Sequence, residues 1–103
     1  MKWPRCQLGA TNDAVQAAER LGRISEELGE EFVETFAKAL EQIQQTPRRF
    51  PQLETNETEE EIRRVILNRF NYLIIFKMVG DTPVVAAVMH ASQQPDSWRQ
   101  GRE

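Results

Sequence analysis

Residues 71–90, NYLIIFKMVGDTPVVAAVMH, contain two apolar runs separated by four turn-forming residues. The runs, Asn71–Val79 and Val84–His90, are rich in the β-branched and aromatic side chains that are typical of strands. Gly80-Asp81-Thr82-Pro83 indicates a hairpin turn between them. Neither run alternates strictly between apolar and polar residues, so we expect both faces of this strand pair to be covered, at least in part.

A third strand is expected on the N-terminal side of this hairpin, over Ile62–Asn68, where an arginine pair precedes an apolar run. Residues 62–90 would then form a three-stranded antiparallel β-meander, followed by a polar tail over 91–103. Residues 1–10 show no clear period, and we expect them to be irregular, with a short extended piece near Cys6 to Leu8. A first strand would thus be weak or missing, and one edge of the sheet would be exposed.

Two helices are expected before the meander. Apolar residues recur at spacings of three and four over 12–28 and again over 29–46, as on one face of an amphipathic helix. Thr11-Asn12-Asp13 indicates the start of the first helix, because short oxygen-bearing side chains accept hydrogen bonds from the N–H groups of a first turn. Leu28-Gly29 indicates its end, and Pro47 stops the second helix. The predicted fold is α+β, a helical hairpin packed on a three-stranded antiparallel β-meander.

Composition narrows the class of protein. With 103 residues, the chain is expected to form one domain. A net charge of −3 argues against broad nucleic-acid binding, because neutralising phosphates needs a basic face. No apolar run approaches the ~20 residues of a membrane-spanning helix, and the chain starts without the apolar segment of a signal peptide. One cysteine, Cys6, and one histidine, His90, predict no internal disulfide and no zinc site, which fits a reducing cytoplasm.

The order of these features resembles the RelE/ParE superfamily of bacterial toxins. Leu28-Gly29-x-x-Phe32 is similar to the family's helix junction, and Thr46–Pro51 to the loop after its second helix. Ile62–Tyr72 is similar to the ParE-type strand, an arginine pair and an apolar run before Arg-Phe-Pro-Tyr. His90-x-x-Gln93-x-Pro95-x-x-Trp98 is similar to its closing motif, and the resemblance covers roughly residues 14 to 102.

Three positions depart from the pattern of this family. Family members usually open with a β-strand that is not evident here, Gln93 stands where they usually have arginine, and Asn71 replaces the proline before Tyr72. The first two differences keep an inactive family remnant, serving only as an antitoxin sink or a structural partner, among the alternatives.

The resemblance implies the toxin component of a type II toxin–antitoxin system, a ParE-like plasmid stabilisation toxin that needs no cofactor or metal. Such a toxin holds DNA gyrase in a poisoned state and is neutralised by a cognate antitoxin. We expect the antitoxin to cover the groove beside the alanine-rich first helix and the edge of the sheet. Contact with a membrane or directly with nucleic acid is not expected, and a homodimer stays open. The candidates for target or partner binding are Arg63, Arg64, Arg69, His90 and Trp98.

The alternative within the family is a RelE-like, ribosome-dependent mRNA interferase. Such enzymes place basic residues on the sheet, because in-line phosphoryl transfer needs positive charge at the transition state. Where they carry an arginine after the central-strand tyrosine, this chain has Leu73, and Ser92, Gln93 and Trp98 stand in its C-terminal region. His90 is the one conventional general base of the chain, and its plainer interpretation is a strand-end histidine bonded to backbone. For Trp98 the plainer interpretation is a lid packed on the sheet.

Overall fold

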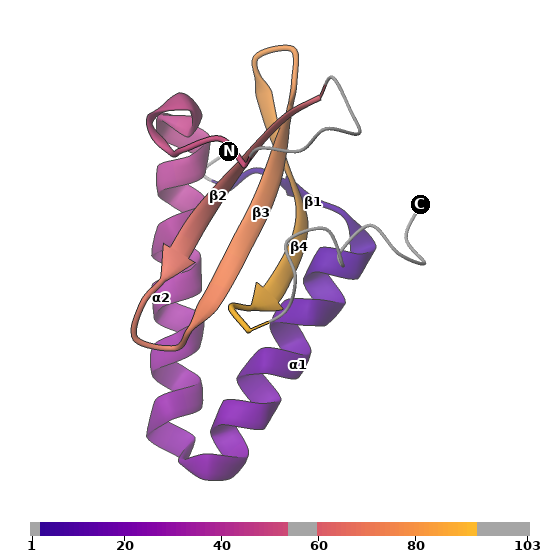
Figure 1. The fold of residues 1–103 in the computed structure, drawn as a ribbon. Helices are drawn as coiled ribbons and strands as arrows, with labels where there is room; N and C mark the ends of the chain where they lie inside the picture. Colours follow the sequence, from indigo (N-terminus) through magenta and orange to yellow (C-terminus); the bar gives the residue numbers. More distant parts are fainter. Residues whose placement is uncertain (1–2, 54–59, 93–103) are drawn as a thin grey trace.

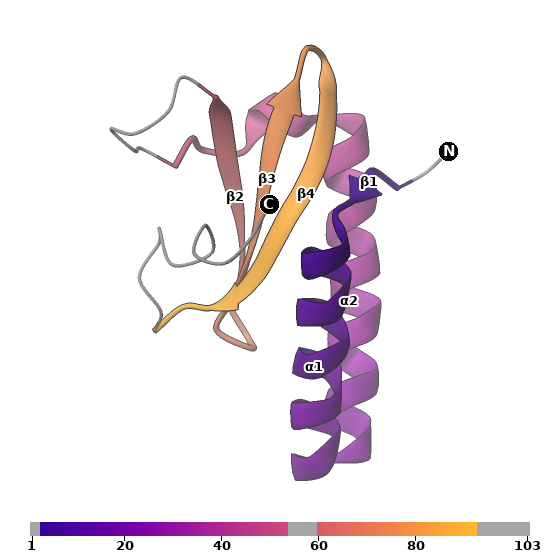
Figure 2. The same cartoon turned by 90° about the vertical axis from the view of Figure 1, so that its right-hand side faces the viewer.

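Two long helices lie on one face of a four-stranded sheet in the computed structural model, which describes residues 3–53 and 60–92 (Figures 1 and 2). The elements are β1 Arg5–Cys6, α1 Leu8–Ile24, α2 Glu26–Gln45, the 3-10 turn η1 Pro47–Arg49, β2 Glu61–Leu67, β3 Tyr72–Val79 and β4 Thr82–His90. The predicted α+β fold, with a helical hairpin on a sheet, is confirmed. Within the described residues, neither helix is both long and apolar enough to cross a membrane.

The sheet contains the predicted meander and one strand more. Its order is β1-β4-β3-β2, with β2–β3 and β3–β4 antiparallel. The first strand is weak, as expected: β1 has two residues, Arg5 and Cys6, which pair in parallel with Val84 and Val85 of β4. The segment departs from the expected irregular structure in that α1 already begins at Leu8. A two-residue strand has no side-chain period to detect. Its backbone bonding to β4 continues as the N–H of Gln7 donates to the carbonyl of Val85 at 2.9 Å, and Cys6 packs against the core.

The turns of the meander are tighter than the sequence suggests. Thr82 and Pro83 belong to β4, opposite Val79 and Met78, so the predicted four-residue turn shrinks to Gly80 and Asp81. Gly80 supplies the positive φ, 64°, that a two-residue hairpin favours. In the turn between β2 and β3, Asn71 has a φ of 59°. Proline is fixed near −65° and could not adopt it, which explains the departure at this position.

The predicted start of the first helix is wrong, and so is the predicted junction between the two helices. The α1 helix begins at Leu8, so Thr11, Asn12 and Asp13 lie inside it. The two helices meet at Ser25, whose extended backbone ends α1 and whose hydroxyl accepts the N–H of Leu28 at 3.3 Å to cap α2. Gly29 therefore lies inside α2.

Gly29 lies where the backbones of the two helices come close together. A Cβ added there would lie 3.0 Å from the Cα of Gly22 and 3.1 Å from the carbonyl oxygen of Ala18. Tight packing between the backbones, and not a turn, is thus the physical reason for this glycine. The hairpin stays narrow as a result, and both helices reach the sheet.

The main core lies between the hairpin and the sheet. The ring of Phe32 on α2 contacts Phe70 and Tyr72 edge-on, with centroids 5.4 and 5.6 Å apart. Phe76 and Ile74 of β3 are fully buried on the same side. On the opposite face of the sheet, a second cluster of buried residues contains Ile62, Ile75, Ala87 and Met89. Burial of Ile75 and Ala87 there confirms that the central strands are covered on both faces.

Candidate functional site

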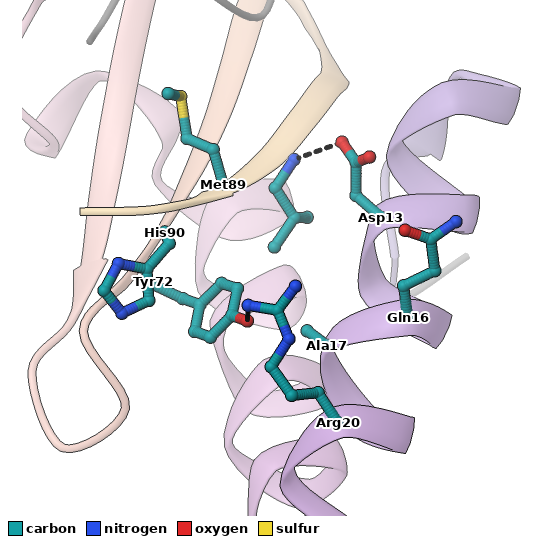
Figure 3. Close-up of a pocket in the computed structure, with 8 residues that line it drawn as sticks. Asp13, Gln16, Ala17, Arg20, Tyr72, Met89 and His90 are labelled. Atoms are coloured by element: carbon teal, nitrogen blue, oxygen red, sulfur yellow. Dashed lines mark hydrogen bonds between the residues drawn. The ribbon is translucent and has the colours of Figure 1, made fainter. Parts of the chain in front are cut away.

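A polar pocket of about 450 Å³, open to solvent, lies between α1 and the end of β4 (Figure 3). Asp13, Gln16 and Arg20 reach it from α1, because spacings of three and four place them on one side of the helix. Tyr72 and His90 reach it from the sheet, where they are register partners on β3 and β4. The pocket thus joins side chains that stand more than fifty residues apart in the sequence.

Tyr72 forms the floor of the pocket. Its ring is buried, at 6% exposure, and its hydroxyl accepts a hydrogen bond from Nη1 of Arg20 at 3.4 Å (Figure 3). The ring of His90 meets it edge-on with the centroids 5.2 Å apart. Arg20 is therefore the link between α1 and the tyrosine, and it brings a positive charge to the pocket.

Asp13 connects α1 to the same strand. Its Oδ2 accepts the backbone N–H of Val88 at 3.1 Å (Figure 3). β1 pairs with Val84 and Val85 only, so this carboxylate satisfies a donor on the part of β4 that extends beyond β1. The residue predicted to start a helix instead ties the helix to the sheet.

His90 is held by the turn that follows β4. Its Nδ1 accepts the backbone N–H of Ser92 at 3.1 Å and lies 2.8 Å from the hydroxyl of Ser92. With Nδ1 accepting a backbone proton, the neutral imidazole carries its own proton on Nε2, an assignment that follows from the bonding pattern. His90 thus has the backbone bond that the plainer interpretation of the sequence expected.

Arg63 lies in a network that fastens the loop after α2 to the sheet. Its side chain is 14% exposed, its Nη2 lies 2.7 Å from Oε2 of Glu61, and its Nη1 donates to the carbonyl of Phe50 at 2.5 Å. Arg48 adds ion pairs to Glu61 at 3.2 Å and to Asp81 at 3.1 Å. The hydrogen bond from Arg63, followed by that from Arg48, lowers the pKa of Glu61.

The other predicted residues do not gather at one place. Arg64 is partly buried and pairs with Ile75 in the middle of the sheet. Arg69 lies in the β2–β3 turn, at the end of the sheet where β4 reaches His90 (Figure 1). Its side chain is 66% exposed, and Nη2 lies 2.6 Å from Oε1 of Glu31, an ion pair without hydrogen-bond geometry. Trp98 lies outside the described residues.

A second surface, the hairpin groove, follows the solvent-exposed face of α1 and α2. Two adjoining hollows of about 540 and 510 Å³, both open to solvent, share Ala18 and Val33. Val15 and Val33 line it at 50% and 53% exposure. The groove is formed by Ala14, Val15, Ala18, Gly22, Gly29, Val33 and Phe36, and Glu19, Glu26 and Glu30 lie along it.

The sequence interpretation missed Gln16 and Arg20 as pocket residues and Val15 as a groove residue. A signal for the first pair exists, since Asp13, Gln16 and Arg20 form a polar stripe beside the apolar one. Val15 stands apart from the core-facing stripe of α1, so an isolated exposed valine would have been the only hint. Neither pattern identifies a pocket or a groove from the sequence alone, because the packing of the neighbouring elements is needed as well.

Fold and surfaces together define a class: a small α+β protein in which a helical hairpin covers one face of a β-meander and carries an exposed apolar groove. The family model for the ParE toxin of the type II toxin–antitoxin system, parDE, matches residues 11–95, and the chain belongs to this family. The predicted resemblance is thereby confirmed. The chain is a toxin of the type II toxin–antitoxin kind, and its family implies an antitoxin partner. No curated protein matches it.

Proposed function

We propose that the chain acts by binding a protein target, DNA gyrase, in the bacterial cytoplasm, and that a cognate antitoxin neutralises it. The observation that carries the protein-binding role is the hairpin groove, with two valines half exposed on a chain whose family implies an antitoxin partner, while the gyrase contact is proposed for a different surface. Contiguous apolar surface on a small protein is typical of a site that another chain covers. The polar pocket beside β4 would be a separate surface.

The antitoxin is proposed to cover the hairpin groove. A helix or extended segment that is disordered when alone can fold into such a groove, with anchors in the hollows over Ala18, Gly22 and Gly29. The edge of the sheet is proposed as a second line of contact, which would have to start beside the Val88 N–H, since Asp13 already accepts that donor. Burial of Val15 and Val33 would supply the hydrophobic part of the binding free energy.

The gyrase contact is proposed for the other candidates. Arg69 and His90 stand at the same end of the sheet. Arg64 and Trp98 are also proposed as gyrase contacts. Arg63 stays in the same proposal, although its bonds to Glu61 and Phe50 hold the loop after α2, at the other end of β2 from Arg69. Exposed arginines are frequent in the centres of protein interfaces, which favours Arg69 as the main contact.

Inducible expression tests this proposal. Expression alone should arrest growth with an induced DNA-damage response, and co-expression with the adjacent reading frame should abolish the arrest. Purified chain added to gyrase and supercoiled DNA should increase the cleaved, gyrase-bound fraction. Arg69→Ala should lower that fraction, whereas Arg49→Ala, an exposed arginine on η1, should not. Normal growth would instead indicate an inactive family remnant.

The polar pocket supports a second candidate, RelE-like mRNA cleavage, because Arg20, Tyr72 and His90 all line it. A guanidinium beside a phenol and an imidazole is a combination that can stabilise the charge developing on the scissile phosphate and protonate the leaving 5′-oxygen. Ribosome-bound transcripts incubated with the purified chain should stay intact if gyrase is the target. Transcript cleavage that disappears in His90→Gln would replace the gyrase proposal with this one.

A further inference from the structure

We propose that the hairpin groove selects an amphipathic helix whose apolar stripe is flanked by lysine or arginine. The inference rests on the proposed function, in that the helix is taken to belong to the antitoxin. It adds the chemistry by which the groove distinguishes one helix from another. A second copy of this chain is the competing occupant.

The groove itself fits a helix. Its floor is made of small residues, Ala18, Gly22 and Gly29, which leave room for large apolar side chains of a partner. Val15 on α1 and Val33 on α2 are its exposed apolar walls. A partner helix can therefore pack along α1 and α2, with its apolar stripe facing the groove.

The charged residues that line the groove are all acidic. Glu19 projects from α1, and Glu26 and Glu30 project from α2. All three are exposed, and within residues 3–53 and 60–92 none of them takes part in an ion pair. Glu31, one position further along α2, is by contrast paired with Arg69. The glutamates of the groove are thus available to an incoming cation.

Charge also decides between the two occupants. A second copy related by a two-fold axis would bring the acidic residues Glu19, Glu26 and Glu30 of both copies into one interface, because such an interface uses the same patch twice. Like charges placed opposite one another are unfavourable in an interface. A basic-flanked helix turns the same three carboxylates into attractive contacts and speeds its own association.

Two synthetic peptides provide the test. Both are about 20 residues long, or about 30 Å as a helix, with one leucine–alanine stripe, and they differ in having lysine or glutamate beside it. Binding to the full chain is measured by fluorescence anisotropy at low and high salt. The lysine peptide should bind at least about 10-fold more tightly at low salt, and high salt should reduce that ratio because exposed charges are screened.

The triple variant Glu19→Gln, Glu26→Gln, Glu30→Gln should remove the preference for the lysine peptide. A matched control, Glu27→Gln, Glu34→Gln, Glu41→Gln, changes the net charge equally on α2 residues that do not line the groove, and it should keep the preference. Equal binding of the two peptides, or no binding of either, overturns the inference. So does a dimer of the chain that Val33→Glu dissociates, since the groove would then belong to a second copy.

The product of the adjacent reading frame separates this inference from the proposed function. If that protein neutralises the toxin and its affinity is unchanged in the triple variant, the charge rule fails while the proposed function stands. If it neither binds nor relieves growth arrest, the proposed function fails, whatever the peptides show. Loss of neutralisation in the triple variant, with the control variant unaffected, supports both.

Discussion

Gly29 and Gly22 face each other across the hairpin but differ in the space around them. A Cβ at Gly29 would lie 3.0 Å from backbone, whereas one at Gly22 would meet nothing within 4 Å. Gly29→Ala should therefore lower the free energy of unfolding by about 1–3 kcal/mol, the range for overpacking. Gly22→Ala should be neutral or raise it by up to about 1 kcal/mol, through helix propensity. Urea denaturation of both variants checks this, and equal stability would contradict the close packing.

Glu61 should give the chain a distinct acid sensitivity. Its pKa lies below the ordinary value of 4.5, mainly because Arg63 donates to it. A lowered folded-state pKa contributes stability that is fully present above 4.5 and is lost as pH falls through the lower, folded value. Glu61→Gln should be less stable at neutral pH and should lose less stability on acidification.

Urea midpoints between pH 7 and about pH 3 measure the effect of Glu61. Glu34→Gln serves as the control, since this exposed glutamate of α2 takes part in none of the ion pairs among the described residues. Parallel pH profiles for the natural chain and Glu61→Gln would show that the network with Arg48 and Arg63 adds nothing. Sequence alone could not foresee this network, because Arg63 bonds to a carbonyl thirteen residues away.

Between elements, Asp13 fastens α1 to β4. Asp13→Ala removes the acceptor of the Val88 N–H, and the free energy of unfolding should fall by about 1–3 kcal/mol, the value for an unsatisfied donor. Asp13→Asn retains a side-chain oxygen and should restore part of that loss. Hydrogen exchange should report faster exchange at the Val88 amide in Asp13→Ala. An unchanged rate there would mean that the bond does not protect the strand.

Hydrophobic periodicity was enough to predict the long helices and strands, but it did not predict where one element ends and the next begins. Two apolar stripes predicted α1 and α2, and the runs 71–79 and 84–90 predicted β3 and β4 nearly to their ends. The start signal at Asp13 misled because a carboxylate that can cap a helix can also accept a strand N–H. Ser25 looked unremarkable beside Gly29, although a single extended residue with a capping hydroxyl is enough to separate two helices. β1 is too short to show a side-chain period in the sequence, and only its pairing with β4 identifies it as a strand.

At the scale of the whole molecule, the charged residues divide into structural and exposed sets. Arg63 is nearly buried among bonds to the loop after α2, whereas Arg69 stands on the rim with one ion pair. Both belonged to a single predicted surface, because a sequence does not distinguish an arginine that bonds inward from one that faces a partner. The sequence therefore indicated these arginines as candidates, but separating the structural one from the exposed one required the packing of β2 against the loop.

Two variants separate these roles. Arg63→Ala removes one of the two arginines that donate to Glu61 and leaves the carbonyl of Phe50 without the Arg63 donor, and it should lower the free energy of unfolding by about 1.5–3 kcal/mol. Arg69→Ala breaks an exposed ion pair and should lower it by at most about 1 kcal/mol. Growth arrest should weaken in Arg69→Ala at unchanged protein level, whereas in Arg63→Ala it should follow the amount of folded protein. Full arrest by Arg69→Ala would remove this residue from the target surface, because its loss would then affect neither folding nor binding.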